Sequence, residues 1–209
     1  MARILITSGP TRQYLDPVRY LTNGSSGRMG SAIASACVAA GHEVIVVSGP
    51  VHVAYPDQAR VVSVVSTEEM LEACGREFPA CDGLIATAAP CDYRPRGMAQ
   101  EKIAKTGAPL LIELIETPDV VAALGRNKRA GQWLVGFALE TSDQRIRALV
   151  KLERKSCDLI VLNGPEAIDA DASRVEVMDR GGHILATLHG PKSVLAARIV
   201  DIIQQQLIG

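Results

Sequence analysis

Aromatic residues are scarce in this chain of 209 residues, where Phe, Trp and Tyr together make up 3%. An excess of charge of one sign is also absent, because 22 Lys and Arg oppose 23 Asp and Glu, giving a formal net charge of -1. A near-neutral protein does not attract nucleic acid or an anionic membrane through its overall charge. We therefore expect any anionic ligand to be bound by a local cluster of positive groups.

Long apolar runs are missing as well. No stretch approaches the roughly 20 apolar residues that a membrane span needs, and the first apolar run meets Gly9 and Pro10 too early for a signal peptide. The five cysteines form no CxxC pair and no Cys/His ligand spacing, so they predict free thiols in a reducing compartment. These absences predict a cytoplasmic protein that binds neither membrane nor nucleic acid.

Hydrophobic residues, at 47%, are abundant enough for a substantial core, and the length predicts a single domain over residues 1–209. Short β-branched runs alternate with helical patterns. Strands are expected at 3–7, 43–47, 60–65, 83–87, 110–115, 133–138 and 158–162, with a hairpin of 175–178 and 184–188. Helices are expected at 26–40 and 142–155 and from Thr67, Pro118 and Lys192. This alternation predicts an α/β fold, a doubly wound, mostly parallel, Rossmann-like sheet with an antiparallel edge hairpin.

Glycines do not follow the first strand directly, as they do in a dinucleotide-binding fingerprint. They recur in the run NGSSGRMG at 23–30, which opens the first helix. This run predicts a phosphate loop at a helix N-terminus, formed by Gly24, Ser25, Ser26 and Gly27. The alternative is a serine-capped helix whose glycines pack on the sheet.

The irregular segment 91–107 follows the fourth expected strand and is a candidate flap. Asp92 lies just beyond the carboxyl end of that strand, where α/β sheets bind ligands, and is placed to hold Mg²⁺ against a nucleotide phosphate. An Asx-turn is the alternative use of this aspartate. Lys102, in the run EKIAK, is either a cation for a phosphate group or a solvated lysine.

Three basic residues share one face of the helix expected at 142–155. Arg147, Lys151 and Lys155 follow one another at intervals of four, which is the spacing of a helical stripe. The stripe either binds a triphosphate or is a solvated face. Phe137, near the end of the preceding strand, is either a stacking platform for a base or a core residue.

Taken together, the order and wording of these runs resemble the phosphopantothenoylcysteine synthetase family, also called phosphopantothenate–cysteine ligases. The resemblance rests on the runs at 8–30, 88–95, 117–121, 135–141 and 151–163, together with EKIAK. It covers nearly the whole chain, and the motif DPVRYLTNGSSGRMG is specific because no fold imposes it. Members of this family often form the C-terminal half of a bifunctional coenzyme A biosynthesis flavoprotein.

The resemblance implies a two-step ligase reaction. The carboxylate of 4′-phosphopantothenate attacks the α-phosphate of CTP, in the presence of Mg²⁺, to give an acyl-cytidylate and pyrophosphate; cysteine then displaces CMP. It also implies a homodimer that shares the acyl-substrate site across its interface. Because the chain has no decarboxylase half, we expect no FMN, and a separate decarboxylase would be a partner.

The resemblance also assigns residues. Asn23 matches the asparagine that holds the acyl-nucleotide, and Lys102 matches the lysine used in forming it. The implied nucleotide contacts are Ala86, Thr87, Ala88, Asp92, Lys102, Pro118, Asp119, Val120, Val121, Phe137, Lys151 and Lys155. The chain departs from the family pattern at Pro90-Cys91, where Pro90 removes a backbone donor and leaves the choice of CTP over ATP open. It also departs at Leu162-Asn163-Gly164.

Two rival functions remain at this point. A short-chain, NAD(P)-binding oxidoreductase would share the fold, but the glycines are displaced and no tyrosine has a lysine four residues on. A non-catalytic nucleotide-binding module would keep the fold without the chemistry. The departures near Cys91 favour that module, whereas the joint presence of Asn23, Asp92 and Lys102 favours an enzyme.

Overall fold

The computed structural model of the chain describes residues 1–139, 142–163 and 172–209. Within these ranges, an eight-stranded sheet forms the centre of the molecule, in the order β12-β11-β10-β9-β6-β1-β4-β5. Its strands are β1 (Arg3–Ser8), β4 (Glu43–Ser48), β5 (Arg60–Ser63), β6 (Gly83–Ala86), β9 (Trp133–Leu139), β10 (Leu159–Asn163), β11 (Ala172–Asp179) and β12 (Ile184–Pro191). The six strands from β10 to β5 in this order run parallel to one another. The other two, β11 and β12, form an antiparallel hairpin at one edge of the sheet, next to β10.

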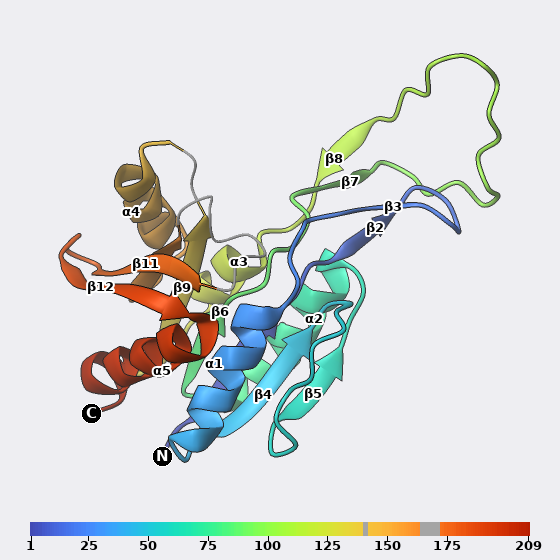
Figure 1. Ribbon diagram of the computed structural model, residues 1–209. Coiled ribbons are helices and arrows are strands. Elements are labelled where there is room, and N and C mark those ends of the chain that lie inside the picture. Colours follow the sequence, from blue (N-terminus) through green and yellow to red (C-terminus); the bar gives the residue numbers. More distant parts are fainter. Residues whose placement is uncertain (140–141, 164–171) are drawn as a thin grey trace.

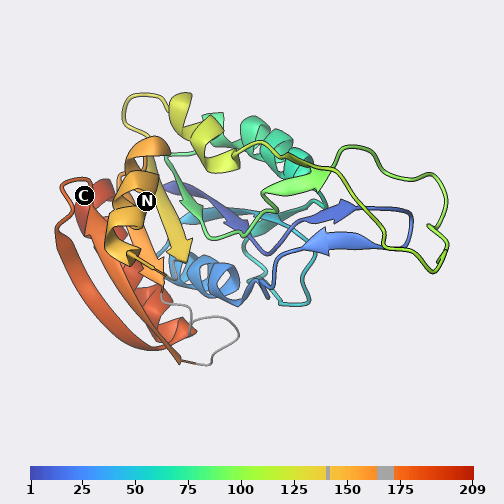
Figure 2. The same ribbon diagram turned by 90° about the horizontal axis from the view of Figure 1, so that it is seen from above.

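Helices cover both faces of this sheet, so the predicted doubly wound, Rossmann-like α/β fold is confirmed (Figures 1 and 2). One face carries α1 (Arg28–Ala39), α5 (Lys192–Ile203) and a π-helical turn η3 (Gln204–Ile208); the other carries α2 (Thr67–Glu77), the 3₁₀ turn η1 (Phe78–Ala80), α3 (Val120–Arg126) and α4 (Gln144–Arg154). Alternate side chains of β1 enter the two cores: Ile4 and Ile6 on the α1 side, Leu5 on the α2 side. Among the described residues, no helix is both long and apolar enough to cross a membrane.

Two predicted boundaries around α3 are wrong. The third helix begins at Val120, not at Pro118, because Asp119 is its N-cap and its Oδ1 accepts the N–H of Ala122 at 3.1 Å. The strand expected over 110–115 is the short β8 (Leu114–Glu116). Its apolar sequence suggested an earlier start, but Leu111 is 92% exposed and packs in neither core.

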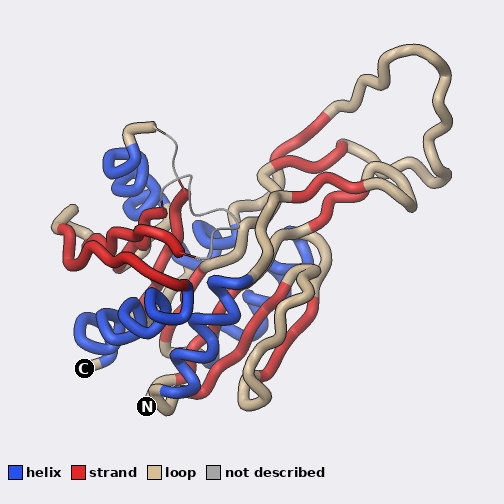
Figure 3. The backbone as a smooth tube through the Cα atoms, in the orientation of Figure 1, coloured by secondary structure: helices blue, strands red, loops and turns tan. Residues whose placement is uncertain are grey.

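An arm projects from the sheet and was not predicted (Figures 1 and 3). It consists of residues 12–22 and 93–116, which contain two antiparallel pairs: β2 (Arg12–Tyr14) with β3 (Tyr20–Thr22), and β7 (Tyr93–Pro95) with β8. Its two halves are joined by backbone bonds such as Ala99 N to Leu15 O at 2.9 Å. The predicted flap, 91–107, therefore lies largely in this arm. Strands of three residues carry too little periodicity to be recognised in a sequence.

Candidate functional site

A cavity of about 490 Å³ opens at the carboxyl ends of the parallel strands. We call it the edge cavity. It is lined by residues 23–30, 87–90, 92 and 137–139, together with Lys151, Asn163, Ser173 and Lys192. Such an edge is where open α/β sheets bind ligands. Among the described lining residues, Arg28, Lys151 and Lys192 are cationic and Asp92 is the carboxylate, so positive charge prevails locally on a chain of net charge -1.

The predicted phosphate loop leads from β3 into α1 along one wall of this cavity. Gly27 is the N-cap of α1 with φ 77°, a left-handed conformation that favours glycine, and no side chain caps the helix. Ser25 and Ser26 line the cavity instead. The serine-capped helix is thus wrong, although glycine packing is present: a Cβ on Gly30 would lie 2.1 Å from Ser8 Oγ. The absent side chain lets the uncapped helix end approach the sheet edge.

Asn23 bridges two stretches at the mouth of the cavity. Its Nδ2 donates to the backbone carbonyls of Ala89 at 3.2 Å and Pro90 at 2.9 Å. The side chain is exposed on the cavity side. The predicted catalytic asparagine therefore presents its amide donors beside the loop that follows β6.

The loop after β6 brings Thr87, Ala88 and Asp92 to the cavity, while Ala86 remains buried inside the strand. Thr87 Oγ1 donates to Thr7 O at 2.6 Å, which holds this loop against β1. Asp92 is exposed. Among the described residues, no group of three or more His, Cys, Asp or Glu side chains is arranged so that it could hold a metal ion. A metal ion here would therefore rely on Asp92 and on ligand phosphates.

The three residues of the basic stripe of α4 do not all line the cavity. Lys151 lines the cavity, and Phe137 reaches it from β9. Lys155 instead pairs with Asp119, Nζ to Oδ1 at 3.1 Å. Burial alone would raise the pKa of Asp119, but the N–H of Ala122 and the Lys155 charge outweigh burial and hold that pKa below its usual range. Pro118, Asp119, Val120 and Val121 lie at the start of α3 and, like Arg147, are not part of the cavity lining.

Lys102 lies in the 93–116 part of the arm, and the arm projects from the sheet (Figure 1). The neighbouring Ile103 is held by two contacts to the β2–β3 turn: its N–H donates to Asp16 Oδ2 at 3.1 Å, and its carbonyl accepts from Arg19 at 2.5 Å. The Lys102 side chain is exposed and does not line the cavity. Of the two residues predicted to be catalytic, Asn23 lines the edge cavity and Lys102 does not.

Asp16 fixes this part of the arm. Its carboxylate is completely buried and accepts the N–H groups of Val18, Arg19 and Ile103 and the guanidinium of Arg19. Burial alone would raise the pKa of Asp16, but these donors outweigh it and hold the pKa far below its usual value. The segment that carries Lys102 is thus tied to the motif DPVRYLTNGSSG, which also supplies Asn23.

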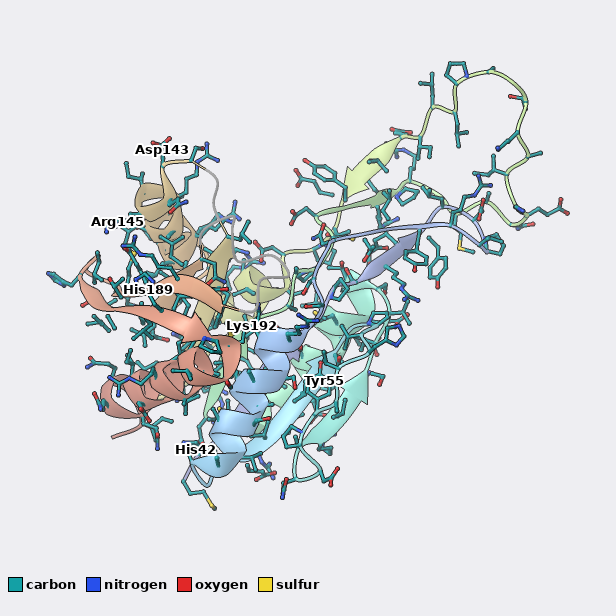
Figure 4. The ribbon with its side chains drawn as sticks, viewed as in Figure 1. His42, Tyr55, Asp143, Arg145, His189 and Lys192 are labelled. Atoms are coloured by element: carbon teal, nitrogen blue, oxygen red, sulfur yellow. The ribbon has the colours of Figure 1, made fainter. Side chains whose placement is uncertain are left out.

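The sequence did not lead us to predict two residues that line the cavity, Ser173 and Lys192. Lys192 is the first residue of α5 and lies where α5 approaches α1 (Figure 4). A signal was present: the second strand of an antiparallel hairpin runs parallel to the strand before the hairpin. The end of β12, and hence the start of α5, must therefore lie at the same edge as the ends of the parallel strands.

Comparisons with known proteins agree on one group. A family model described as the DNA/pantothenate metabolism flavoprotein C-terminal domain matches residues 1–207. A cysteine/cysteine sulfinic acid decarboxylase from an unknown prokaryotic organism is 40% identical over 203 residues, which are 95% of this chain and 56% of that protein. The coenzyme A biosynthesis bifunctional protein CoaBC of Haemophilus influenzae is 36% identical over 205 residues, 97% of this chain and 51% of that protein. The chain thus spans about half the length of the curated relatives it matches.

A solved structure extends the likeness to three dimensions. The crystal structure of the C-terminal domain of CoaBC aligns with a TM-score of 0.82 and 37% sequence identity. The alignment covers 99% of this chain and 95% of that chain, so it includes the arm as well as the sheet.

Proposed function

The chain belongs to the family of the DNA/pantothenate metabolism flavoprotein C-terminal domain, and from this premise we propose that it is a ligase joining 4′-phosphopantothenate to cysteine. The observation that carries the proposal is the composition of the edge cavity. Asn23, Asp92 and Lys151 come from three separate stretches and meet there, next to an uncapped helix N-terminus. This set suits a polyanionic nucleotide with an acyl group attached to it.

The chemistry requires activation of a carboxylate, which is a poor acyl donor at neutral pH. In the first step, a carboxylate oxygen bonds to the α-phosphorus of the nucleoside triphosphate, and the bond to the leaving pyrophosphate breaks. In the second step, the cysteine amine bonds to the acyl carbon, nucleoside monophosphate leaves with its electron pair, and the amine loses a proton. Asn23 donates hydrogen bonds to the intermediate without adding charge, and Lys151 neutralises phosphate.

CTP is the nucleotide we propose, with Mg²⁺ bound to its phosphates. Mg²⁺ is commonly held by one or two carboxylates together with substrate phosphates, and Asp92, an exposed carboxylate at the cavity, fits the protein's share of that role. The ion would neutralise charge on the phosphates. Phe137, half-buried in the cavity wall, supplies an apolar surface for the base or ribose.

A homodimer would reunite the two catalytic residues. The arm exposes several large apolar side chains, among them Val18, Tyr93, Met98, Leu110 and Leu111. Exposed apolar groups in such number favour burial against a partner. We propose that the arms pair two copies of the chain and that Lys102 of one copy completes the cavity of the other.

A decarboxylase activity is not carried over from the prokaryotic relative. The name of that protein describes a whole protein, of which this chain matches 56%. The polar and basic lining of the edge cavity favours nucleotide-dependent ligation instead.

The test incubates the protein with 4′-phosphopantothenate, cysteine, Mg²⁺ and each of the four common nucleoside triphosphates, and measures pyrophosphate and amide product. We expect equal amounts of both products, with CTP as the best nucleotide. Binding of CTP without pyrophosphate release would favour a non-catalytic module. Binding of a nicotinamide dinucleotide, seen as quenching of Trp133 fluorescence, would favour the oxidoreductase.

A further inference from the structure

Three polar residues line the part of the edge cavity that is formed by β10, β11 and α5. Asn163 ends β10, Ser173 lies at the start of β11, and Lys192 is the first residue of α5. We call this set the α5 corner. The ligase chemistry described above uses none of its members.

Strand register places these residues on one face of the sheet. Asn163 faces Val175 across the β10–β11 pair, and Ser173 lies two residues from Val175 on the same strand. Residues opposite each other, or two apart on one strand, point to the same face. Val175 is buried in the core shared with α5. Ser173 in turn faces Gly190, two residues before Lys192, so the serine lies next to the start of α5.

Two polar atoms of the α5 corner lack a hydrogen-bond partner. Ser173 is 7% exposed, and its buried Oγ has no hydrogen-bond partner within the described part of the chain. The Oδ1 atom of Asn163 is also buried and also has no hydrogen-bond partner there. Buried polar atoms are nearly always paired, because leaving one unpaired costs free energy. Ser173 lines the cavity and its hydroxyl can donate or accept a hydrogen bond, and a half-turn of the Asn163 amide offers Nδ2 instead of Oδ1. Both side chains are therefore ready to bind a ligand.

The start of α5 adds positive character to this corner. The helix is twelve residues long, its N-cap is Pro191, no side chain caps it, and no acidic residue lies in its first turn. The first backbone N–H groups of such a helix have no partner within the helix and form its positive end. Lys192 contributes an ammonium group at the same position (Figure 4).

We propose that the α5 corner is a second phosphate subsite of the edge cavity, distinct from the loop at 23–27. The proposal rests on the proposed function, whose substrates carry two separate phosphate-bearing ends. Ser173 donates to a phosphate oxygen, Lys192 neutralises it, and the α5 N–H groups complete the shell. The bound group is either the terminal phosphates of the nucleotide or the 4′-phosphate of the acyl substrate, and the two sources give different kinetic results.

The test uses Ser173→Ala and Lys192→Gln. The serine variant removes a hydroxyl that has no hydrogen-bond partner among the described residues, so we expect the variant to fold. Ser193→Ala and Arg198→Gln are matched controls, because both residues are exposed on α5 and lie outside the cavity lining. The KM and kcat are measured for CTP, for phosphopantothenate and for pantothenate without its phosphate. Calorimetry with inorganic pyrophosphate and inorganic phosphate gives a readout that does not depend on turnover.

Loss of a hydrogen bond to a charged group predicts a KM increase of roughly ten-fold, with little change in kcat, for one substrate only. An increase for CTP assigns the corner to the nucleotide phosphates. A KM increase that is seen for phosphopantothenate, but not for pantothenate, assigns the α5 corner to the 4′-phosphate. Unchanged KM values together with unchanged ion binding in both variants would overturn the subsite. Ion binding weakened by the variants in a protein without turnover would keep the subsite and refute the ligase.

Discussion

The Asn23 side chain spans the mouth of the edge cavity and donates to two carbonyl groups, of Ala89 and Pro90. Those contacts keep its amide beside the loop that follows β6. The same donors are available to an acyl-phosphate oxygen when a ligand displaces a carbonyl. At the scale of single residues, the function therefore depends on donor groups whose orientation is fixed before the substrate arrives.

Replacement of Asn23 by Asp is expected to reduce ligation by about 10²–10³-fold, because the new carboxylate would repel both the carbonyls and the intermediate. Steady-state product formation measures the loss. Asn127→Asp is the matched control, since Asn127 is also exposed and also donates to a backbone carbonyl, that of Ala123 at 3.1 Å. Equal rates for the two variants would show that Asn23 has no catalytic part.

Asp16 makes the arm sensitive to acid. Its pKa in the folded chain lies below the value of about 3.9 in an unfolded chain. A carboxyl group with a lowered folded-state pKa stabilises the fold fully above the unfolded value, and this stabilisation is lost as the pH falls through the folded-state pKa. Asp16 thus holds the arm at neutral pH and releases it only in strong acid.

Substitution Asp16→Asn is expected to speed hydrogen exchange of the amides in 93–116 at pH 7 and to have less effect as the pH falls below about 4. Asp57→Asn, in an exposed turn, is the control. Exchange is followed by mass spectrometry on peptides of the arm. If the two variants protected the arm equally at pH 7, the anchoring role of Asp16 would be wrong.

Elements differ in how far the sequence predicts them. The continuous apolar runs of β1, β4 and β10 are buried on both faces, and such runs identify parallel strands well. The arm was missed because its strands pair through few residues and expose much of their surface. The glycine–serine run indicated the loop before α1, whereas the α5 corner depends on the register of β11 and β12, which no local pattern shows.

Gly30 tests the packing of α1. A Cβ at this position would lie 2.1 Å from Ser8 Oγ and 2.7 Å from Thr87 Oγ1. We expect Gly30→Ala to push α1 away from the sheet edge, to destabilise the fold by about 1–3 kcal/mol and to weaken CTP binding. Thermal unfolding and calorimetry measure the two effects. The control is Gly75→Ala in α2, because a Cβ on Gly75 would have nothing within 4 Å. Tight CTP binding by Gly30→Ala would show that the close approach of α1 to the sheet edge is not required for CTP binding.

At the scale of the whole molecule, the proposed ligase requires two copies of the chain. Asn23 lines the edge cavity and Lys102, in the arm, does not, so we propose that a second copy of the chain supplies Lys102 to the site. A symmetric dimer is the commonest assembly that would supply the second copy. The sequence placed both residues in one site through family likeness, whereas in the structure Asn23 lines the edge cavity and Lys102 does not.

Mixing two inactive variants, Asn23→Asp and Lys102→Gln, tests this proposal. If Lys102 acts in the partner's cavity, random mixing in equal amounts gives about a quarter of the wild-type activity, because half the dimers are mixed and each has one intact site. If the arm folds back onto its own cavity, the mixture stays inactive. Variants mixed after reversible dissociation are compared with each variant treated alone.

We propose that the acid is activated by transfer of a nucleotidyl group to its carboxylate. Phosphopantothenate labelled with ¹⁸O in both carboxylate oxygens distinguishes this route from phosphorylation of the acid. If an acyl-nucleotide forms, each nucleoside monophosphate released carries one labelled oxygen on phosphorus, and the amide keeps the other. Label found in inorganic phosphate, with nucleoside diphosphate as the other product, would show that the acid is phosphorylated and would refute nucleotidyl transfer.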